Sequence, residues 1–255
     1  MVNLEQNLVC FLKSQLDKTA RKTLIVGLSG GLDSSVVLAL CSLVAKTKAY
    51  ILPTSTSNPQ SLEDAIKCAD KFGVEYEILT ISALLKCYEE NLSSLSPYRL
   101  GNLTARVRMC VLYDMSEKEN GVVVGTSNLS ERLLGYSTIY GDSACAFNPI
   151  GEIFKSELYN LAKHLNIPQT IINKPPSADL MLNQTDEKDL GYSYKEIDAV
   201  LKAWYDEGLS FESLSDKFDK NLVNIIKNMV RKNSFKLNMP EIAMIRRDSA
   251  RNTIF

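Results

Sequence analysis

The sequence has no long hydrophobic run, no surplus of either charge and only one histidine. None of its apolar stretches approaches the ~20 residues that a membrane-spanning helix needs, so we expect no contact with a membrane. The formal net charge is −1 and the isoelectric point is about 6.0, which gives no general attraction to nucleic acid. The single histidine, His164, excludes a histidine-rich metal site. Its place at a predicted helix end is typical of a structural residue.

Paired cysteine motifs are absent as well. Cysteines stand at positions 10, 41, 68, 87, 110 and 145 without any C-x-x-C pair, and all lie in apolar segments. We interpret them as buried free thiols of a protein from the reducing cytoplasm. Residues 1–18 do not resemble a signal peptide, because their apolar side chains are spaced helically between charges.

Strand and helix patterns alternate along the chain. Strands are expected at 23–29, 49–54, 74–79 and 122–127. Helices are expected at 1–18, 34–45, 60–73 with Ser61 as its cap, 81–91, 101–121 with a turn at its start, 155–168 and over most of the C-terminal end. Loops are expected at 135–151 and 173–194. This alternation predicts an α/β, Rossmann-like parallel sheet with helices on both faces and a helical C-terminal portion. We expect one domain over residues 1–255.

The segment GLSGGLDSS (27–35) joins the first predicted strand to the next helix, at the sheet edge where ligands bind. Its adjacent glycines and its serines offer N–H and hydroxyl donors in a concave turn suited to a phosphate. It lacks the lysine of a Walker A loop and the spacing of a dinucleotide fingerprint. Asp33 would repel a pyrophosphate unless a cation lay between them, and Mg²⁺ is usually held by one or two carboxylates plus phosphates. The segment therefore predicts a phosphate site that uses Mg²⁺.

The stretch SGGLDSS resembles the pyrophosphate loop of the N-type ATP pyrophosphatases, which cleave ATP between its α and β phosphates. Four later segments are similar, in order and separation, to those of the NAD synthetases in that group: 101–109, 122–142, 174–180 and 184–198. The resemblance covers about residues 20–240 and implies the adenine-nucleotide alpha-hydrolase-like fold. It also implies a ligase that adenylates the nicotinate carboxylate of deamido-NAD with ATP. Ammonia then displaces AMP, and the products are NAD, AMP and pyrophosphate.

The resemblance also implies particular contacts. ATP is expected to bind the loop residues Gly27, Leu28, Ser29, Gly30, Gly31, Leu32, Asp33 and Ser34, together with Thr126, Lys155 and Ser177. Deamido-NAD is expected to bind Arg106, Phe235 and Lys236, with Arg108 as a weaker candidate. Glu131 follows the fourth strand and is expected to complete a Mg²⁺ site with Asp33. Catalytic roles are expected for Asp33, Lys155 and Asp142, the last by holding ammonia or receiving its proton.

Structural alternatives stay open for several of these residues. Thr126 could cap a helix, Asp142 could be an ordinary turn residue, and Glu131 could lie on a solvated helix face. Lys174, beside Ser177, could help neutralise pyrophosphate or could be an ordinary surface lysine.

Three positions depart from the common pattern of the family. Ile139 and Ala146 stand where many relatives have a lysine and an aspartate that contact deamido-NAD, and Phe235 stands where many have histidine. The contacts of that lysine and that aspartate are not carried over to Ile139 and Ala146, and the pose of the dinucleotide is left open.

The sequence also disfavours two other functions. A tRNA thiolase is disfavoured because the chain has no C-x-x-C pair and no basic excess. A nucleotide-binding module without catalysis is disfavoured by the intact Asp33, Glu131, Lys155 and Ser177. Only about 20 residues precede the first strand, so we expect no glutaminase domain. Free ammonia is therefore the expected nitrogen donor. The resemblance implies a homodimer.

Overall fold

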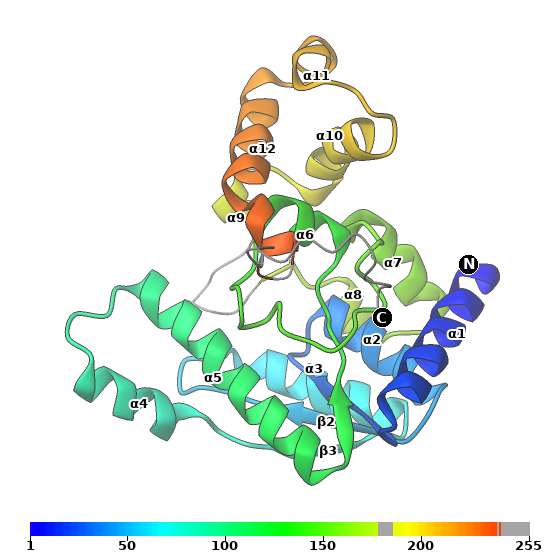
Figure 1. The fold of residues 1–255 in the computed structure, drawn as a ribbon, viewed down its shortest axis with the longest axis vertical. Helices are drawn as coiled ribbons and strands as arrows, with labels where there is room; N and C mark the ends of the chain where they lie inside the picture. Colours follow the sequence, from blue (N-terminus) through cyan, green and yellow to red (C-terminus); the bar gives the residue numbers. More distant parts are fainter. Residues whose placement is uncertain (178–185, 239, 241–255) are drawn as a thin grey trace, which may run out of the picture.

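The computed structural model describes residues 1–177, 186–238 and 240. Its centre is a parallel sheet in the order β3-β2-β1-β4. The strands are β1 (Thr23–Gly27), β2 (Thr47–Ile51), β3 (Glu75–Ile78) and β4 (Gly121–Val123). The predicted parallel sheet is thus confirmed, with strands that end sooner than the apolar runs do (Figure 1).

Helices connect the strands and cover both faces of the sheet. They are α1 (Val2–Thr19), α2 (Leu32–Ser42), α3 (Pro59–Lys71), α4 (Ser82–Asn91), α5 (Pro97–Lys118), α6 (Leu129–Leu134), α7 (Lys155–His164), α8 (Gln169–Ile172), α9 (Asp186–Leu190), α10 (Tyr194–Tyr205), α11 (Phe211–Lys217), α12 (Lys220–Asn233) and the 3₁₀ helix η1 (Ser234–Leu237). Of the helices in the described ranges, none is long and apolar enough to cross a bilayer.

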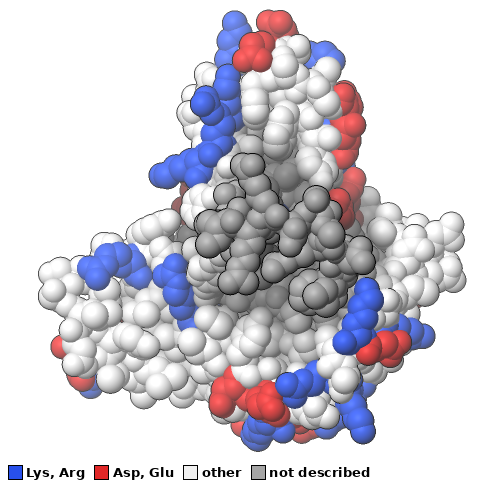
Figure 2. Space-filling view, in the orientation of Figure 1, with Lys and Arg blue, Asp and Glu red and all other residues white. Residues whose placement is uncertain are grey.

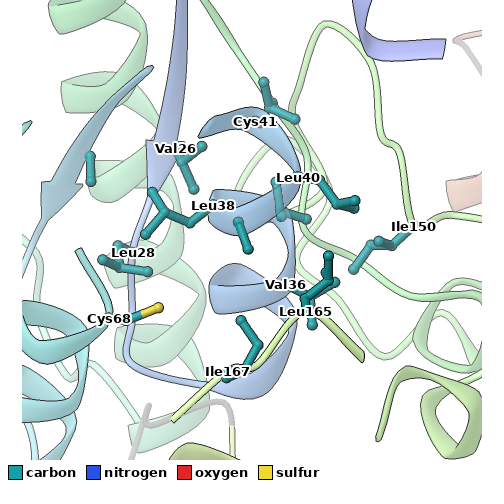
Figure 3. Close-up of a cluster of buried hydrophobic side chains, with 14 of the residues drawn as sticks. Val26, Leu28, Val36, Leu38, Leu40, Cys41, Cys68, Ile150, Leu165 and Ile167 are labelled. Carbon is teal, nitrogen blue, oxygen red and sulfur yellow. The ribbon is translucent and has the colours of Figure 1, made fainter. Parts of the chain in front are cut away.

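Alternating side chains of the central strand build two separate cores. Leu24 and Val26 join Leu40 of α2 in a cluster that also includes buried residues of α1, α3 and α7. Figure 3 shows Val26 and Leu40 among the side chains around α2. Ile25, between them in β1, packs on the opposite face with Val107 of α5. A period of two with both faces buried is expected of a parallel strand between helical layers.

A third cluster lies in the helical C-terminal portion. Buried side chains of α6, α10 and α12 form it, among them Leu133, Val200 and Ile226. In Figure 1, α10, α11 and α12 stand together above α6, apart from the sheet. The predicted helical C-terminal portion is confirmed, and the single domain over residues 1–255 stays a prediction.

Two predicted helix starts are wrong. Helix α5 begins at Pro97, where the Ser96 side chain accepts a hydrogen bond from the Arg99 N–H, so Gly101 lies inside the helix and not in a turn. Helix α3 begins at Pro59 after an Asn58 cap. In both places proline occupies the first helical turn, where its missing N–H costs nothing. The predicted loop at 173–194 contains α9, while 178–185, 239 and 241–255 lie outside the described residues.

The expectation of buried cysteines is wrong for half of them. Cys41 and Cys68 are buried, but Cys10, Cys87 and Cys110 are exposed. These three lie on α1, α4 and α5, which are covered on one side only, and their positions fall on the outer side. All six thiols are free. His164 is the last residue of α7, and its Nε2 lies 2.7 Å from Oε2 of Glu5 on α1, a link between two helices as expected of a structural histidine.

Candidate active site at the carboxyl edge of the sheet

A cavity of about 1400 Å³ opens where β1, β2 and β4 end. The chain leaves β1 toward β2 on one side, while β4 lies on the other side of β1. In open α/β sheets this arrangement leaves a crevice at the carboxyl ends of the strands, where ligands bind. The turns after all three strands line the cavity: 27–29, 51–53 and 124–127. The turns after three different strands therefore share one crevice.

The glycine loop is braced by its own hydroxyl groups. Ser29 Oγ lies 3.1 Å from Ser34 Oγ and accepts from the Gly31 N–H at 3.2 Å. Ser35 Oγ donates to the Gly31 carbonyl at 2.8 Å. Gly30 has φ +75°, and a Cβ there would lie 2.0 Å from the carbonyl oxygen of Ser61. Glycine is therefore required at position 30 both by its backbone angle and by the close approach of α3.

Three of the predicted residues meet beside this loop. Lys155 of α7 forms an ion pair with the Asp33 carboxylate of α2, and its Nζ lies 3.7 Å from Oε1 of Glu131 on α6. The other Asp33 oxygen accepts from the Asn128 amide at 2.8 Å. The Lys155 side chain is only 4% exposed, so a lysine from a distant segment supplies the cation that the glycine loop itself lacks.

The neighbouring charges shift the pKa values of Lys155 and Glu131. Burial lowers the pKa of Lys155, but the Asp33 and Glu131 carboxylates outweigh burial and raise it above the usual lysine value. Burial and the neighbouring Asp33 raise the pKa of Glu131, against the opposite effect of Lys155. Lysine therefore stays protonated, and the second carboxylate is the group whose charge is hardest to keep.

The same two carboxylates are suited to a magnesium ion. The Asp33 and Glu131 carboxylates both lie within 4 Å of the Lys155 ammonium, so they face the same small region. Both offer the oxygen ligands that Mg²⁺ prefers. Within the described residues no group of three or more His, Cys, Asp or Glu could hold a metal alone. Phosphate oxygens would have to complete the coordination, which is the usual arrangement for Mg²⁺ at nucleotides.

Two residues that the sequence did not single out hold this group in place. Asp198 of α10 accepts from Ser130 Oγ at 2.5 Å and from the Ser156 N–H at 2.8 Å. Ser130 Oγ in turn accepts from the Lys155 N–H at 2.9 Å. Asp198 is 1% exposed, so one buried carboxylate ties α10 to α6 and α7. The available signal was an acidic residue on the apolar face of a predicted helix.

The remaining predicted ATP contacts also face the cavity. Thr126 and Ser177 both line it. The cap of α6 is Asn128, whose side chain accepts from the Glu131 N–H at 3.0 Å. This removes the alternative in which Thr126 is the helix cap.

Of the three residues predicted to contact the dinucleotide, one lines the cavity and two do not. Lys236 lines the cavity and donates from Nζ to the carbonyls of Gly135 and Ser137 at 2.8 and 2.9 Å. Arg106 and Phe235 are not among the lining residues. Arg106 Nε donates to the Ile139 carbonyl at 3.3 Å. Arg108, the weaker candidate, does line the cavity.

Asp142 accepts a hydrogen bond that holds a turn together, and it also faces the cavity. Its Oδ1 accepts from the Thr138 N–H at 2.8 Å, and Thr138 Oγ1 donates to Asn102 of α5 at 2.8 Å. Asp142 is nevertheless a lining residue. One carboxylate oxygen therefore fixes the turn at 138–142 while the group as a whole stays within reach of a ligand.

A parallel sheet with a glycine loop and an acid–lysine–acid group at its carboxyl edge defines a nucleotide-binding α/β protein. The family model for NAD synthase matches residues 4–240. The NH(3)-dependent NAD(+) synthetase of Helicobacter pylori strain P12 is 47% identical over 240 residues, which cover 91% of this chain and 92% of that one. The chain belongs to the NAD synthase family.

Solved structures agree with this assignment. The NH3-dependent NAD synthetase of Campylobacter jejuni matches with a TM-score of 0.81 and 39% identity, over 94% of this chain and 98% of that one. The NMN synthetase of Francisella tularensis matches with a TM-score of 0.86 and 29% identity, over 95% of this chain and 98% of that one. Both likenesses extend over the sheet and the helical C-terminal portion.

Proposed function

We propose that this chain catalyses the ATP-dependent amidation of deamido-NAD by ammonia, with NAD, AMP and pyrophosphate as products. The observation that carries the proposal is the meeting of Asp33, Lys155 and Glu131 beside a lysine-free glycine loop. It is supported by the relatives over the same length that are named NH(3)-dependent NAD(+) synthetases. A tRNA thiolase or a module without catalysis has no observation in its favour.

The reaction needs two displacements at bound substrates. A nicotinate carboxylate oxygen attacks the α-phosphorus of ATP, the bond to the β-phosphate breaks, and pyrophosphate leaves. Ammonia then attacks the carbonyl carbon of the acyl-adenylate, AMP leaves with its oxygen, and the nitrogen loses a proton. No side chain forms a covalent bond, so the chain acts by positioning and by stabilising charge.

The described residues divide this work between them. The N–H groups of the glycine loop and the Lys155 ammonium stabilise charge on the phosphates. Mg²⁺ held by Asp33 and Glu131 would polarise the α-phosphate and neutralise pyrophosphate. Asp142, on the cavity wall, receives the proton that ammonia loses. Thr126 and Ser177, which line the cavity, bind ATP, and Lys236, also on its wall, binds the dinucleotide. Arg106 and Phe235 do not line the cavity, so their contacts with the dinucleotide stay predictions.

The assay for this function measures NAD formation by purified protein with ATP, Mg²⁺, deamido-NAD and either ammonium or glutamine. We expect NAD with ammonium and none with glutamine. Because a structural neighbour is an NMN synthetase and Ile139, Ala146 and Phe235 depart from the common pattern, nicotinate mononucleotide is the competing substrate to include. Efficient turnover of the mononucleotide without turnover of deamido-NAD would reassign the substrate. Absence of pyrophosphate release with any of them would remove the ligase assignment.

A homodimer is proposed on the side of α4 and α5. Large apolar side chains are exposed there, among them Leu84, Tyr88, Leu92 and Tyr98, the last 76% exposed. Figure 2 shows few charged side chains over the region in which α4 and α5 lie. Exposed apolar surface of this kind often marks a protein interface.

Light scattering tests the dimer. We expect about twice the chain mass of 28.4 kDa, and a shift toward the monomer in Tyr98→Glu, because a charge would then be buried without a partner. Tyr205→Glu is the matched control on α10, which lies away from α4 and α5. A monomeric wild-type protein would exclude the dimer.

We also propose the cytoplasm as the compartment, since six free thiols suit reducing conditions.

A further inference from the structure

Lys174 is a second lysine brought to the glycine loop from a distant segment. It follows α8, and its Nζ donates to Ser61 Oγ at 2.7 Å and to Asp64 Oδ2 at 3.5 Å, both on α3. In the described part of the chain these are its acceptors. An ammonium group has three N–H donors, so one N–H is left for a ligand.

Asp64 stands behind this lysine and is enclosed by the fold. It is 1% exposed, whereas the Lys174 side chain is 21% exposed. Its Oδ1 accepts from Thr170 Oγ1 at 3.0 Å and from the Gln60 amide at 3.3 Å. A buried carboxylate held by three partners has little freedom, and it fixes the ammonium on its solvent side.

The ammonium lies next to the phosphate loop. The Ser61 carbonyl is the group that a Cβ on Gly30 would meet at 2.0 Å, so the backbone of Ser61 touches the loop. The Ser61 hydroxyl holds Lys174, and Ser61, Lys174, Ser29 and Gly31 all line the same cavity. Lys174 is thus separated from the loop by a single residue.

The charged groups at the loop are net negative before any phosphate binds, and Lys174 can supply a further positive charge. Asp33, Lys155 and Glu131 together carry a net charge of −1 when all three are ionised, because two carboxylates face one ammonium. The β- and γ-phosphates of ATP add several negative charges to that place. Lys174 and Asp64 are neutral as a pair, but the positive end faces the cavity and the negative end is buried.

We propose that Lys174 binds the β- and γ-phosphates of ATP and then the leaving pyrophosphate, with Asp64 as its positioning residue. This inference rests on the proposed cleavage of ATP to pyrophosphate. The competing explanation is that Lys174 serves only to neutralise a buried carboxylate.

The experiment measures binding of inorganic pyrophosphate, in buffer with Mg²⁺, by calorimetry, and KM for ATP and for deamido-NAD separately. For Lys174→Gln we expect pyrophosphate to bind about tenfold more weakly, because a charge-assisted hydrogen bond is lost. KM for ATP should rise and KM for deamido-NAD should stay. Lys174→Arg should recover most of the binding. Lys67→Gln is the matched control, since Lys67 lies on α3 but its ion-pair partner in the described part of the chain is the exposed Glu63.

The positioning role is tested by a double-mutant cycle. Asp64→Asn keeps an oxygen for Thr170 and should weaken pyrophosphate binding about threefold. Asp64→Asn combined with Lys174→Gln should bind as Lys174→Gln alone does, because Asp64 acts through the lysine. Independent, multiplying effects would overturn the positioning role. Unchanged pyrophosphate binding in folded Lys174→Gln, with a lowered unfolding temperature, would overturn the whole inference.

The readout also separates this inference from the proposed function. Pyrophosphate binding needs no turnover, so loss of binding in Lys174→Gln supports the site even if the wild-type protein fails to amidate deamido-NAD. Wild-type NAD formation with pyrophosphate binding that ignores Lys174 would retain the function and reject the site.

Discussion

Asp33→Asn is expected to lower kcat about 10³-fold, a loss on the scale seen when one preorganised charge-stabilising group is removed from an active site. The amide offers a single weak oxygen where the carboxylate offered two charged ones. It therefore loses the ion pair with Lys155 and the proposed Mg²⁺ ligand together. The hydrogen bond from the Asn128 amide can be kept by the remaining oxygen. The measurement is pyrophosphate release and NAD formation at several Mg²⁺ concentrations.

The fold should tolerate this change. Asp33, Lys155 and Glu131 go from a net charge of −1 to zero, so the buried ammonium still has a carboxylate partner at 3.7 Å. We expect the free energy of unfolding to fall by about 1.5–3 kcal/mol, the cost of one hydrogen bond to a charged group. Asp17→Asn, at an exposed position on α1, is the control and should leave both quantities unchanged. Turnover close to wild type in Asp33→Asn would remove Asp33 from the mechanism.

Local sequence was enough to predict the residues at the centre of the site. Gly30, Asp33 and Glu131 lie in or just after turns that follow strands, so the strand order alone brings them to one edge of the sheet. Lys155 begins a helix in another segment, and only the family resemblance pointed to it. The structure places its ammonium between the two carboxylates, an arrangement that no spacing along the chain predicts.

The sequence named Lys174 as a candidate, but the pairing of the supporting residues could not be predicted, for a physical reason. Asp64 and Lys174 are 110 positions apart, and Asp198 and Ser130 are 68 apart. Each buried carboxylate finds its partners through tertiary packing, which a helical pattern does not contain. The pattern contained only the anomaly, an acidic residue on an apolar helix face, and burial without a partner is costly enough to make such an anomaly informative.

The first residues of α3 and α5 were also predicted wrongly, by a few positions. Ser61 and Gly101 are residue types common at a cap and in a turn, but the helices begin earlier, at Asn58-Pro59 and Ser96-Pro97. Proline fixes its own φ near the helical value, so the earlier cap begins the helix. Ser61 is therefore not a helix cap; its buried side chain accepts a hydrogen bond from Lys174.

Asp198→Ala is expected to lower the free energy of unfolding by about 3 kcal/mol. The Ser130 hydroxyl and the Ser156 N–H would both lose their acceptor in a buried place, and each unsatisfied donor costs about 1–3 kcal/mol. For a chain of this size that is a fall in the unfolding temperature of about 6–12 °C. Asp206→Ala, at the exposed end of the same helix, is the control and should stay within about 0.5 kcal/mol.

The effect of Asp198 should also reach the active site. Ser130 Oγ accepts from the Lys155 N–H, so a Ser130 that has lost Asp198 no longer fixes the start of α7. In folded Asp198→Ala, measured well below its unfolding temperature, we expect kcat to fall about tenfold because Lys155 is less well placed. Asp198→Asn keeps one acceptor oxygen for two donors and should show about half of the loss in stability. Equal losses for Ala and Asn would mean that the charge, rather than the two hydrogen bonds, ties α10 to α6 and α7.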